Sequence, residues 1–290
     1  MQLLPFFSPQ GIDAVCLNVI ISAAVTGDMS VDLLKICDPW AYYTQFLFES
    51  VYPDGRSISS FRPVSLQMGI TESASGSSVA RQGGAMITAR IEPFLGVSSD
   101  DTVIVPHIEA TSVIPQRVVE DAEVLLKQLI EEEAFFKRDI LLTANGRLMW
   151  ILHLHILILN VDSCLLDALV TCVTAAFLDL RLPKVRVDLD ADITVNINEA
   201  LISEELEHIP LADMPAKILC DPVAELFDLL PSKASIVVGN NARVYRTVIS
   251  GYCGDEGIIR QLFQLAASRQ KLVSEALLKA RDANLKMNSA

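Results

Sequence analysis

Residues 38–56 read DPWAYYTQFLFESVYPDGR, a helix followed by a turn, and the architecture of the chain can be followed outward from it. Asp38 followed by Pro39 is typical of a helix start, because proline at the first helical position loses no hydrogen bond. The sequence therefore predicts a helix over 40–49. The Pro-Asp-Gly-Arg run at 53–56 predicts a turn, since proline presets φ and glycine permits a left-handed residue.

Short alternating runs bounded by glycine follow this turn. Apolar and polar residues alternate over 64–68, 77–81 and 85–91, and glycines lie at the bends, which predicts antiparallel strands. A further strand is expected at 102–106. Apolar residues at helical spacing, with acids opposite, then predict an amphipathic helix over 118–136.

An Asn-Gly pair at 145–146 lies between two apolar runs and is the strongest short-range signal for a β-hairpin. The strands of this hairpin are expected at 140–143 and 148–159. The second strand is so apolar that both its faces should be covered. Ser163 is a candidate N-cap for a helix that runs to about residue 180, shortly before a proline ends it.

The C-terminal half repeats this order of short strands followed by a helix. The closing helix is expected from about residue 255 to 283, with an apolar stripe that includes Leu262, Ala266 and Val273. Two such halves define an α+β fold and suggest a pseudo-repeat, although their sequences are not visibly alike. The strands expected in this half cover 184–188, 193–197, 216–219, 235–238 and 243–250.

Composition favours a large apolar interior and extensive burial against partners. Of the 290 residues 51% are hydrophobic, and the mean hydropathy is +0.39. The longest uncharged runs, 14–27 and 148–161, are shorter than the roughly 20 residues that an α-helix needs to span a bilayer, so no membrane span is expected. The opening MQLLPFFSPQ lacks the Lys/Arg cluster of a secretory signal, which favours an intracellular protein.

Charge and metal-ligand spacing argue against several functions. With 23 Lys+Arg against 36 Asp+Glu the net charge is −13, so any RNA contact must be local or shared with basic neighbours. The six cysteines form no Cys-x-x-Cys pair and no zinc-like spacing. No cofactor and no metal are expected. His153 and His155 share a strand face and could hold a metal, but packed or interface histidines are favoured.

Several motifs in a consistent order resemble those of RNase PH-like domains. They are the tyrosine pair and the Pro-Asp-Gly-Arg turn within 38–56, the Phe-Arg-Pro run at 61–63, the glycine-bounded stretch 76–83 and the passage NVDSCLLDA at 160–168. The resemblance runs from about Cys37 to Ala283. It implies an α+β RNase PH-like fold built of two similar halves.

This resemblance also implies a division of the chain. A divergent N-terminal segment is expected at 1–36 and an RNase PH-like domain at 37–290. The two halves of that domain are expected at about 37–183 and 184–290.

The chain is most similar to RNase PH-like ring subunits of the eukaryotic RNA exosome, and its departures from active relatives imply that it is not an enzyme. Active members carry Asp-Gly-Gly or Asp-Ala-Gly, often followed by Thr-Arg, where this chain has Asp162-Ser163-Cys164-Leu165. They carry several arginines near 111–118, where this chain has only Arg117. No catalytic residue is therefore expected, and Asp162 marks the degenerate site. The alternatives are an active phosphate-dependent 3′-to-5′ exoribonuclease and a stand-alone adaptor.

Four arginines are expected along an RNA path through a ring: Arg56, Arg62, Arg81 and Arg117. For Arg56 and Arg62 a structural role is favoured, because an arginine beside a turn more often bonds the backbone carbonyls of that turn. Asp162 and Asp167 flank a helix start, where negative charge favours the helix dipole.

The family implies partners as well. Its ring has six RNase PH-like subunits, topped by S1/KH cap subunits, and RNA passes through the ring to a separate nuclease. The chain is therefore expected in a hetero-oligomer with other ring subunits, cap subunits and RNA, and with no membrane. Its expected roles are RNA and rRNA processing and RNA degradation in the nucleus, the nucleolus and the cytoplasm.

Overall fold

The structure is a computed structural model, and its contacts divide the chain into two compact units, Met1–Ser60 and Phe61–Ala290. The boundaries expected at 36/37 and 183/184 stay predictions. The structure describes residues 29–97, 103–112, 114–136, 138–142, 148–162, 165–182, 184–188, 191–196, 206–214, 217–230, 232–239, 243–251 and 256–288.

The first unit contains two short helices and the predicted turn. Helix α2 (Met29–Cys37) is followed directly by α3 (Pro39–Phe48). The Asp38 carboxylate caps α3 by accepting a hydrogen bond of 3.0 Å from the Ala41 N–H, so the predicted helix start is confirmed. The turn after α3 is also confirmed, because Gly55 has φ +82°.

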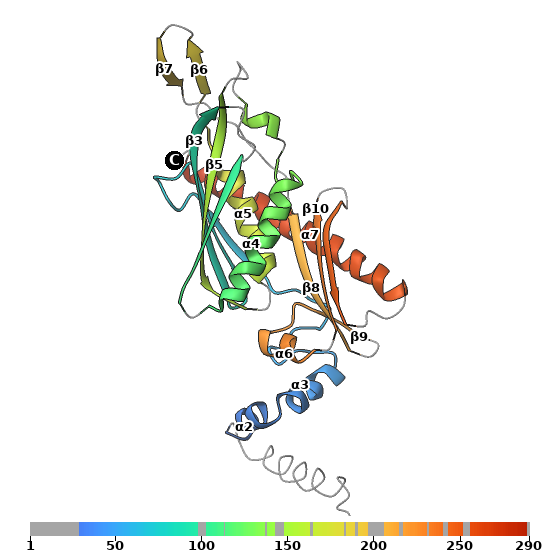
Figure 1. The fold of residues 1–290 in the computed structure, drawn as a ribbon. Helices are drawn as coiled ribbons and strands as arrows, with labels where there is room; N and C mark the ends of the chain where they lie inside the picture. The colour runs from blue at the N-terminus through green and yellow to red at the C-terminus, as the bar shows by residue number, and fades with distance from the viewer. Residues whose placement is uncertain are drawn as a thin grey trace, which may run out of the picture. The chain divides into compact units, whose positions relative to one another are not determined.

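The second unit begins with a five-stranded sheet in the order β1-β2-β3-β5-β4 (Figure 1). Strand β4 runs parallel to β5, and the other neighbours are antiparallel. Gly83 (φ +55°) and Gly84 make the turn between β2 and β3. The strands are β1 (Val64–Met68), β2 (Gly76–Gln82), β3 (Ala85–Val97), β4 (Ile104–Ala110) and β5 (Leu148–Asn160).

The hairpin expected around Asn145-Gly146 is wrong in its first strand. Residues Arg138–Leu141 form a short 3₁₀ helix, and only Leu142 makes an isolated bridge, to Met149. The reason is that β3 and β4 already occupy the two edges of β5. Residues 143–147, with the Asn-Gly pair itself, and 163–164, with the expected N-cap, lie outside the described residues.

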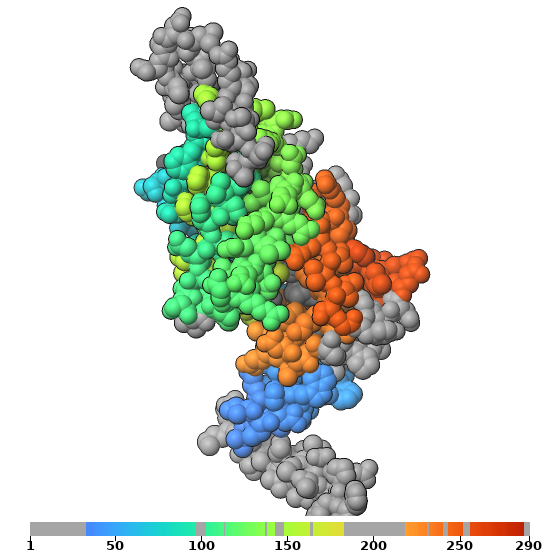
Figure 2. All heavy atoms as spheres, viewed as in Figure 1, coloured from blue at the N-terminus to red at the C-terminus, as the bar shows by residue number. Residues whose placement is uncertain are grey.

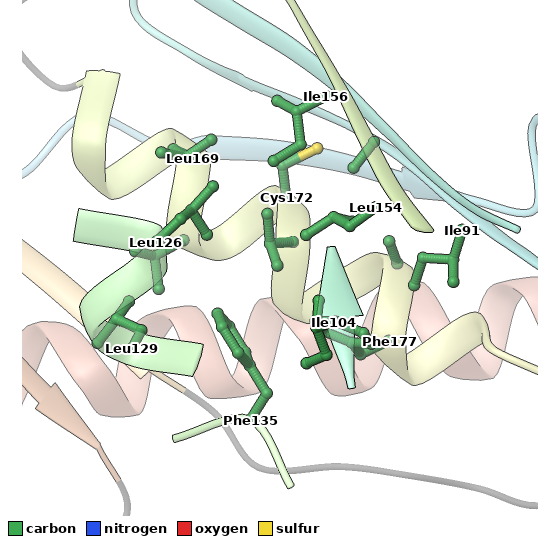
Figure 3. Close-up of a cluster of buried hydrophobic side chains, with 14 of the residues drawn as sticks. Ile91, Ile104, Leu126, Leu129, Phe135, Leu154, Ile156, Leu169, Cys172 and Phe177 are labelled. Atoms are coloured by element: carbon green, nitrogen blue, oxygen red, sulfur yellow. The ribbon is translucent and has the colours of Figure 1, made fainter. Parts of the chain in front are cut away.

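Two helices cover one face of this sheet and bury the main core (Figure 3). Helix α4 (Gln116–Glu131) packs on β4, and α5 (Leu165–Asp179) packs on β2 and β3. Along β5, Leu152, Leu154 and Ile156 are at most 1% exposed. The residues between them are partly exposed, so the expectation that both faces of β5 are covered is wrong. One face alone receives the helices.

The second sheet is antiparallel, in the order β11-β10-β8-β9. Helix α5 also contacts β8, and α7 contacts β1, β8 and β10, so these two helices join both sheets. The α+β class is therefore confirmed. None of the helices within the described ranges is long and apolar enough to cross a membrane. The remaining elements are β6 (Lys184–Asp188), β7 (Ala191–Asn196), β8 (Leu206–Met214), β9 (Lys217–Cys220), α6 (Ala224–Leu229), β10 (Lys233–Gly239), β11 (Val244–Ser250) and α7 (Glu256–Asn288).

Candidate functional site: a buried network of carboxylates and guanidiniums

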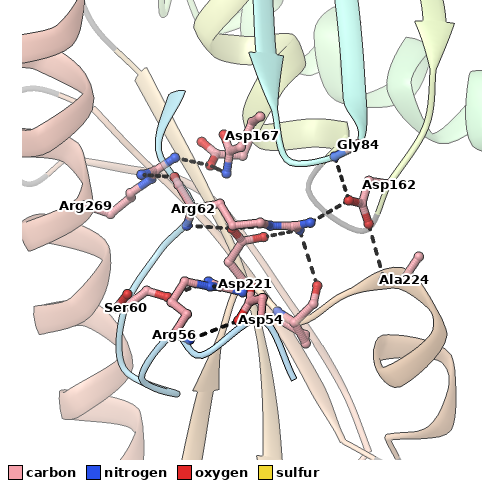
Figure 4. Close-up of polar contacts among 12 residues, drawn as sticks. Asp54, Arg56, Ser60, Arg62, Gly84, Asp162, Asp167, Asp221, Ala224 and Arg269 are labelled. Carbon is pink, nitrogen blue, oxygen red and sulfur yellow. Dashed lines mark hydrogen bonds and ion pairs between the residues drawn. The ribbon is translucent and has the colours of Figure 1, made fainter. Parts of the chain in front are cut away.

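The predicted RNA-path residue Arg62 lies at the centre of a buried polar network (Figure 4). It precedes β1, and only 7% of the residue is exposed. Its backbone N–H and Nε both donate to Asp221 Oδ2 at 2.9 Å, and Nη2 donates to Asp221 Oδ1 at 2.6 Å. Such a bidentate pair is the strongest guanidinium–carboxylate geometry. Asp221 follows β9 and lies 159 residues away in the chain.

Asp162, the expected degenerate site position, is the second acceptor of this network. Its Oδ2 accepts from Arg62 Nη1 at 2.5 Å and from the Gly84 N–H at 2.9 Å. Its Oδ1 accepts from the Ala224 N–H at 3.2 Å, at the start of α6. Asp162 therefore ties together the end of β5, the β2–β3 turn and α6. Its expected place beside the start of α5 holds, and these hydrogen bonds give it a structural role that the sequence did not predict.

Asp167 forms the second half of the network and is fully buried, at 1% exposure. Its Oδ2 accepts from Gln82 Nε2 at 2.7 Å and from Arg269 Nη2 at 2.9 Å. Arg269 Nη1 also donates to the Arg62 carbonyl at 3.3 Å, which links the two halves of the network. Asp167 lies in the first turn of α5, as expected, and its side chain also pairs with Arg269 of α7 in the interior.

The electrostatics of Asp167 follow from its burial. Desolvation raises the pKa of its carboxyl, while the Arg269 charge and the hydrogen bonds from Gln82 and Arg269 lower it. Its Oδ1 has no hydrogen-bond partner within the described part of the chain. The carboxylate thus depends on Arg269 for its charge compensation.

This network can fix structure, but it presents little for chemistry on a substrate. The Arg62 side chain is 9% exposed and faces two carboxylates. These carboxylates take the donors that a phosphate would need. The adjacent Gly83 has positive φ, and a Cβ added there would collide with the Arg62 guanidinium.

The other arginines expected on an RNA path are Arg56, Arg81 and Arg117. Arg56 bonds the Ser60 carbonyl at 2.5 Å, pairs with Asp54 at 3.3 Å and lies over the Tyr52 ring, so it fixes its own turn. Arg81 is exposed on β2, and Arg117 is exposed in the first turn of α4. Their RNA contacts stay predictions.

A cluster of three histidines on the open face of the first sheet was only partly expected. Because β4 and β5 are parallel, His107 is brought opposite His155, and His107 Nε2 lies 3.1 Å from His153 Nδ1. Glu92 lies 3.7 Å from His155. Desolvation lowers the pKa of His155. The Glu92 charge raises that pKa, while Arg90 and the other two imidazoles lower it further. No group of three or more metal-ligand side chains among the described residues is arranged to hold a metal ion.

The fold and its core motifs are similar to those of RNase PH-like proteins. Residues 60–183 match the RNase PH family, described as 3′ exoribonuclease family, domain 1. The chain is similar to solved structures of that fold. An archaeal exosome core subunit superposes with a TM-score of 0.65 at 23% identity, over 86% of this chain and 98% of that one. Rice (Oryza sativa) Rrp46 gives a TM-score of 0.59 at 15% identity, over 79% of this chain and 99% of that one. The predicted RNase PH-like fold is confirmed.

Several proteins that are similar to this chain in sequence are named exosome complex components. Rrp42 of Methanothermobacter thermautotrophicus is 28% identical over 64% of this chain and 73% of the relative. Rrp42 of Pyrococcus furiosus is 25% identical over 82% of this chain and 94% of the relative. Rrp43 of Schizosaccharomyces pombe is 23% identical over 76% of this chain and 87% of the relative. The resemblance to exosome ring components expected from the motifs is confirmed.

Proposed function

We propose that this protein is a non-catalytic structural subunit of the RNA exosome ring. In this role it supports 3′-to-5′ RNA processing and degradation by threading RNA to a separate nuclease. The observation that carries the proposal is the extent of the similarity. The alignment with Pyrococcus furiosus Rrp42 spans 266 residues and 94% of that exosome component, so it includes both halves of the fold.

The state of the buried network supports a role without catalysis. Phosphorolysis needs cationic groups that can reach a phosphate and the RNA backbone. Here the Arg62 guanidinium is buried between Asp162 and Asp221. The stretch 111–118 contains one basic residue, Arg117 in the first turn of α4, and three acids follow it closely in that helix.

Partners, location and ring position belong to the same proposal. The partners are other RNase PH-like ring subunits, S1/KH cap subunits and RNA within the assembled complex, in the nucleus, the nucleolus and the cytoplasm. Within the ring, the tyrosine pair Tyr42-Tyr43 and the Leu-Leu-Asp-Ala run at 165–168 favour the position of the subunit called exosome component eight in humans.

A phosphate-dependent RNA degradation assay tests the absence of catalysis. The purified chain, alone and paired with an RNase PH-like neighbour, is incubated with a 5′-labelled single-stranded RNA with and without inorganic phosphate. We expect no phosphate-dependent shortening from the chain alone, and none from the pair beyond that of the neighbour. Phosphate-dependent shortening by the chain alone would favour the active exoribonuclease instead.

A further inference from the structure

Strand β11 is an outer edge of the second sheet. It pairs with β10 along one side from Val244 to Ser250, and no described strand pairs with its other side. An edge strand presents a row of backbone N–H and C=O groups that another strand can use. The usual defences are sparse in β11, because VYRTVIS contains no proline and no glycine, and its one register irregularity, at Tyr245, lies near the start of the strand.

The side chains of β11 are exposed on both faces of the sheet. Val244, Val248 and Ile249 are each 42–43% exposed, in a strand where no residue is buried. In the space-filling view the orange atoms of the C-terminal strands lie at the surface (Figure 2). Apolar side chains along an open edge indicate a surface that a second chain can cover.

The charge along this edge indicates which chain covers it. The strand carries Arg246 and no acid, and Arg243 immediately precedes it. Arg243 lies over the Tyr245 ring, whereas Arg246 forms no ion pair with any described residue. A second copy of this strand would bring more positive charge and no counter-charge. A different subunit with a carboxylate in its pairing segment would satisfy Arg246.

We propose that the outer edge of β11 binds an extended, acid-containing segment of a neighbouring RNase PH-like subunit by strand addition. This inference rests on the proposed function and names the surface that the function needs. Main-chain hydrogen bonds supply the attraction, and the exposed valines and Arg246 select the segment. RNA lacks the peptide groups that complete an edge and gains no stacking surface from valine side chains.

Two substitutions on the edge and two matched controls test this surface. Arg246→Glu and Val248→Asp should each weaken association of the chain with its RNase PH-like neighbour at least tenfold. Arg260→Glu on α7 and Val124→Asp on α4 make the same changes at exposed positions outside this strand and should stay within twofold of wild type. Edge variants that bind within twofold of wild type would overturn the proposal.

Hydrogen exchange on the wild-type complex tests strand addition at β11 without any variant, so a poorly folded variant does not affect the result. Backbone amides of 244–250 should exchange at least tenfold more slowly in the complex than in the free chain. If the complex forms and these amides gain no protection, the edge inference fails and ring membership stands. Protection that instead requires only RNA or only a second copy of this chain also overturns it. A wild-type chain that binds no RNase PH-like subunit would sink the proposed function itself.

Discussion

Replacing Arg269 by methionine is the sharpest test of the buried network. The substitution removes the Arg269 guanidinium, which contacts Asp167 at 2.9 Å, and so takes away the counter-charge of a carboxylate that is 1% exposed. Methionine keeps most of the volume, so the effect on packing is small. Breaking a buried ion pair by removing one partner costs about 3–5 kcal/mol, since the remaining charge is uncompensated. We therefore expect a loss of about that size in the free energy of unfolding.

The pH dependence of this loss follows from the raised pKa of Asp167. An acid whose pKa is higher in the folded than in the unfolded state stabilises the fold most at low pH. This contribution falls as the pH rises from near the ordinary value of 3.8 through the raised one. Arg269 lowers the pKa of this carboxyl, so its removal raises that pKa further. The cost of Arg269→Met should accordingly be larger at pH 7 than at pH 5.

Urea unfolding followed by circular dichroism measures both effects on the purified chain. Arg260→Met is the matched control on the same helix, because its ion pair with Glu256 is exposed and should contribute less than about 1 kcal/mol. The double variant Arg269→Met/Asp167→Leu should recover much of the loss, since it removes both charges. A cost below about 1 kcal/mol for Arg269→Met, or one independent of pH, would refute the assigned role of the pair.

Three further outcomes follow from the same structure. Gly83→Ala should lower stability by about 1–3 kcal/mol in thermal unfolding, because φ is positive and the new Cβ meets the Arg62 guanidinium. Asp162→Asn should leave RNA degradation by the assembled complex unchanged within error, while lowering the thermal midpoint through the weakened pair with Arg62. In native thiol labelling with peptide mapping, Cys37 should react and Cys172 should not, because burial raises the pKa of the Cys172 thiol to about 11.

Each of these three predictions has a control or a result that would contradict it. Gly257→Ala meets no atom within 4 Å and should not destabilise, so an equal loss at both glycines would reject the collision. A tenfold drop in phosphate-dependent RNA turnover for Asp162→Asn would indicate that Asp162 belongs to an active site. Native labelling of Cys172 at the rate of Cys37 would contradict the burial of α5.

The sequence predicted those elements whose signals are local. The cap and proline before α3, and the glycines that bound β2 and β3, lie next to the structure they determine. Strand β8 was missed because Pro210 interrupts it, and proline is disfavoured within a sheet. The structure tolerates it because β9 pairs only from Leu211 onward, which leaves β8 a local edge at Pro210.

The site could be predicted only as separate residues. Arg62, Asp162 and Asp167 were each singled out, but the partners Asp221 and Arg269 lie in the other half of the chain. Nothing in their local sequence indicates which charges meet. A buried pair of this kind depends on how the two sheets dock through α5 and α7, and that is a property of tertiary packing.

The native mass of the complex that contains this chain, purified from its own cells under mild conditions, tests the central claim most directly. The account predicts one copy of the chain in a hetero-oligomer with other RNase PH-like subunits and cap proteins. A free monomer, or a complex without any other RNase PH-like subunit, would contradict it.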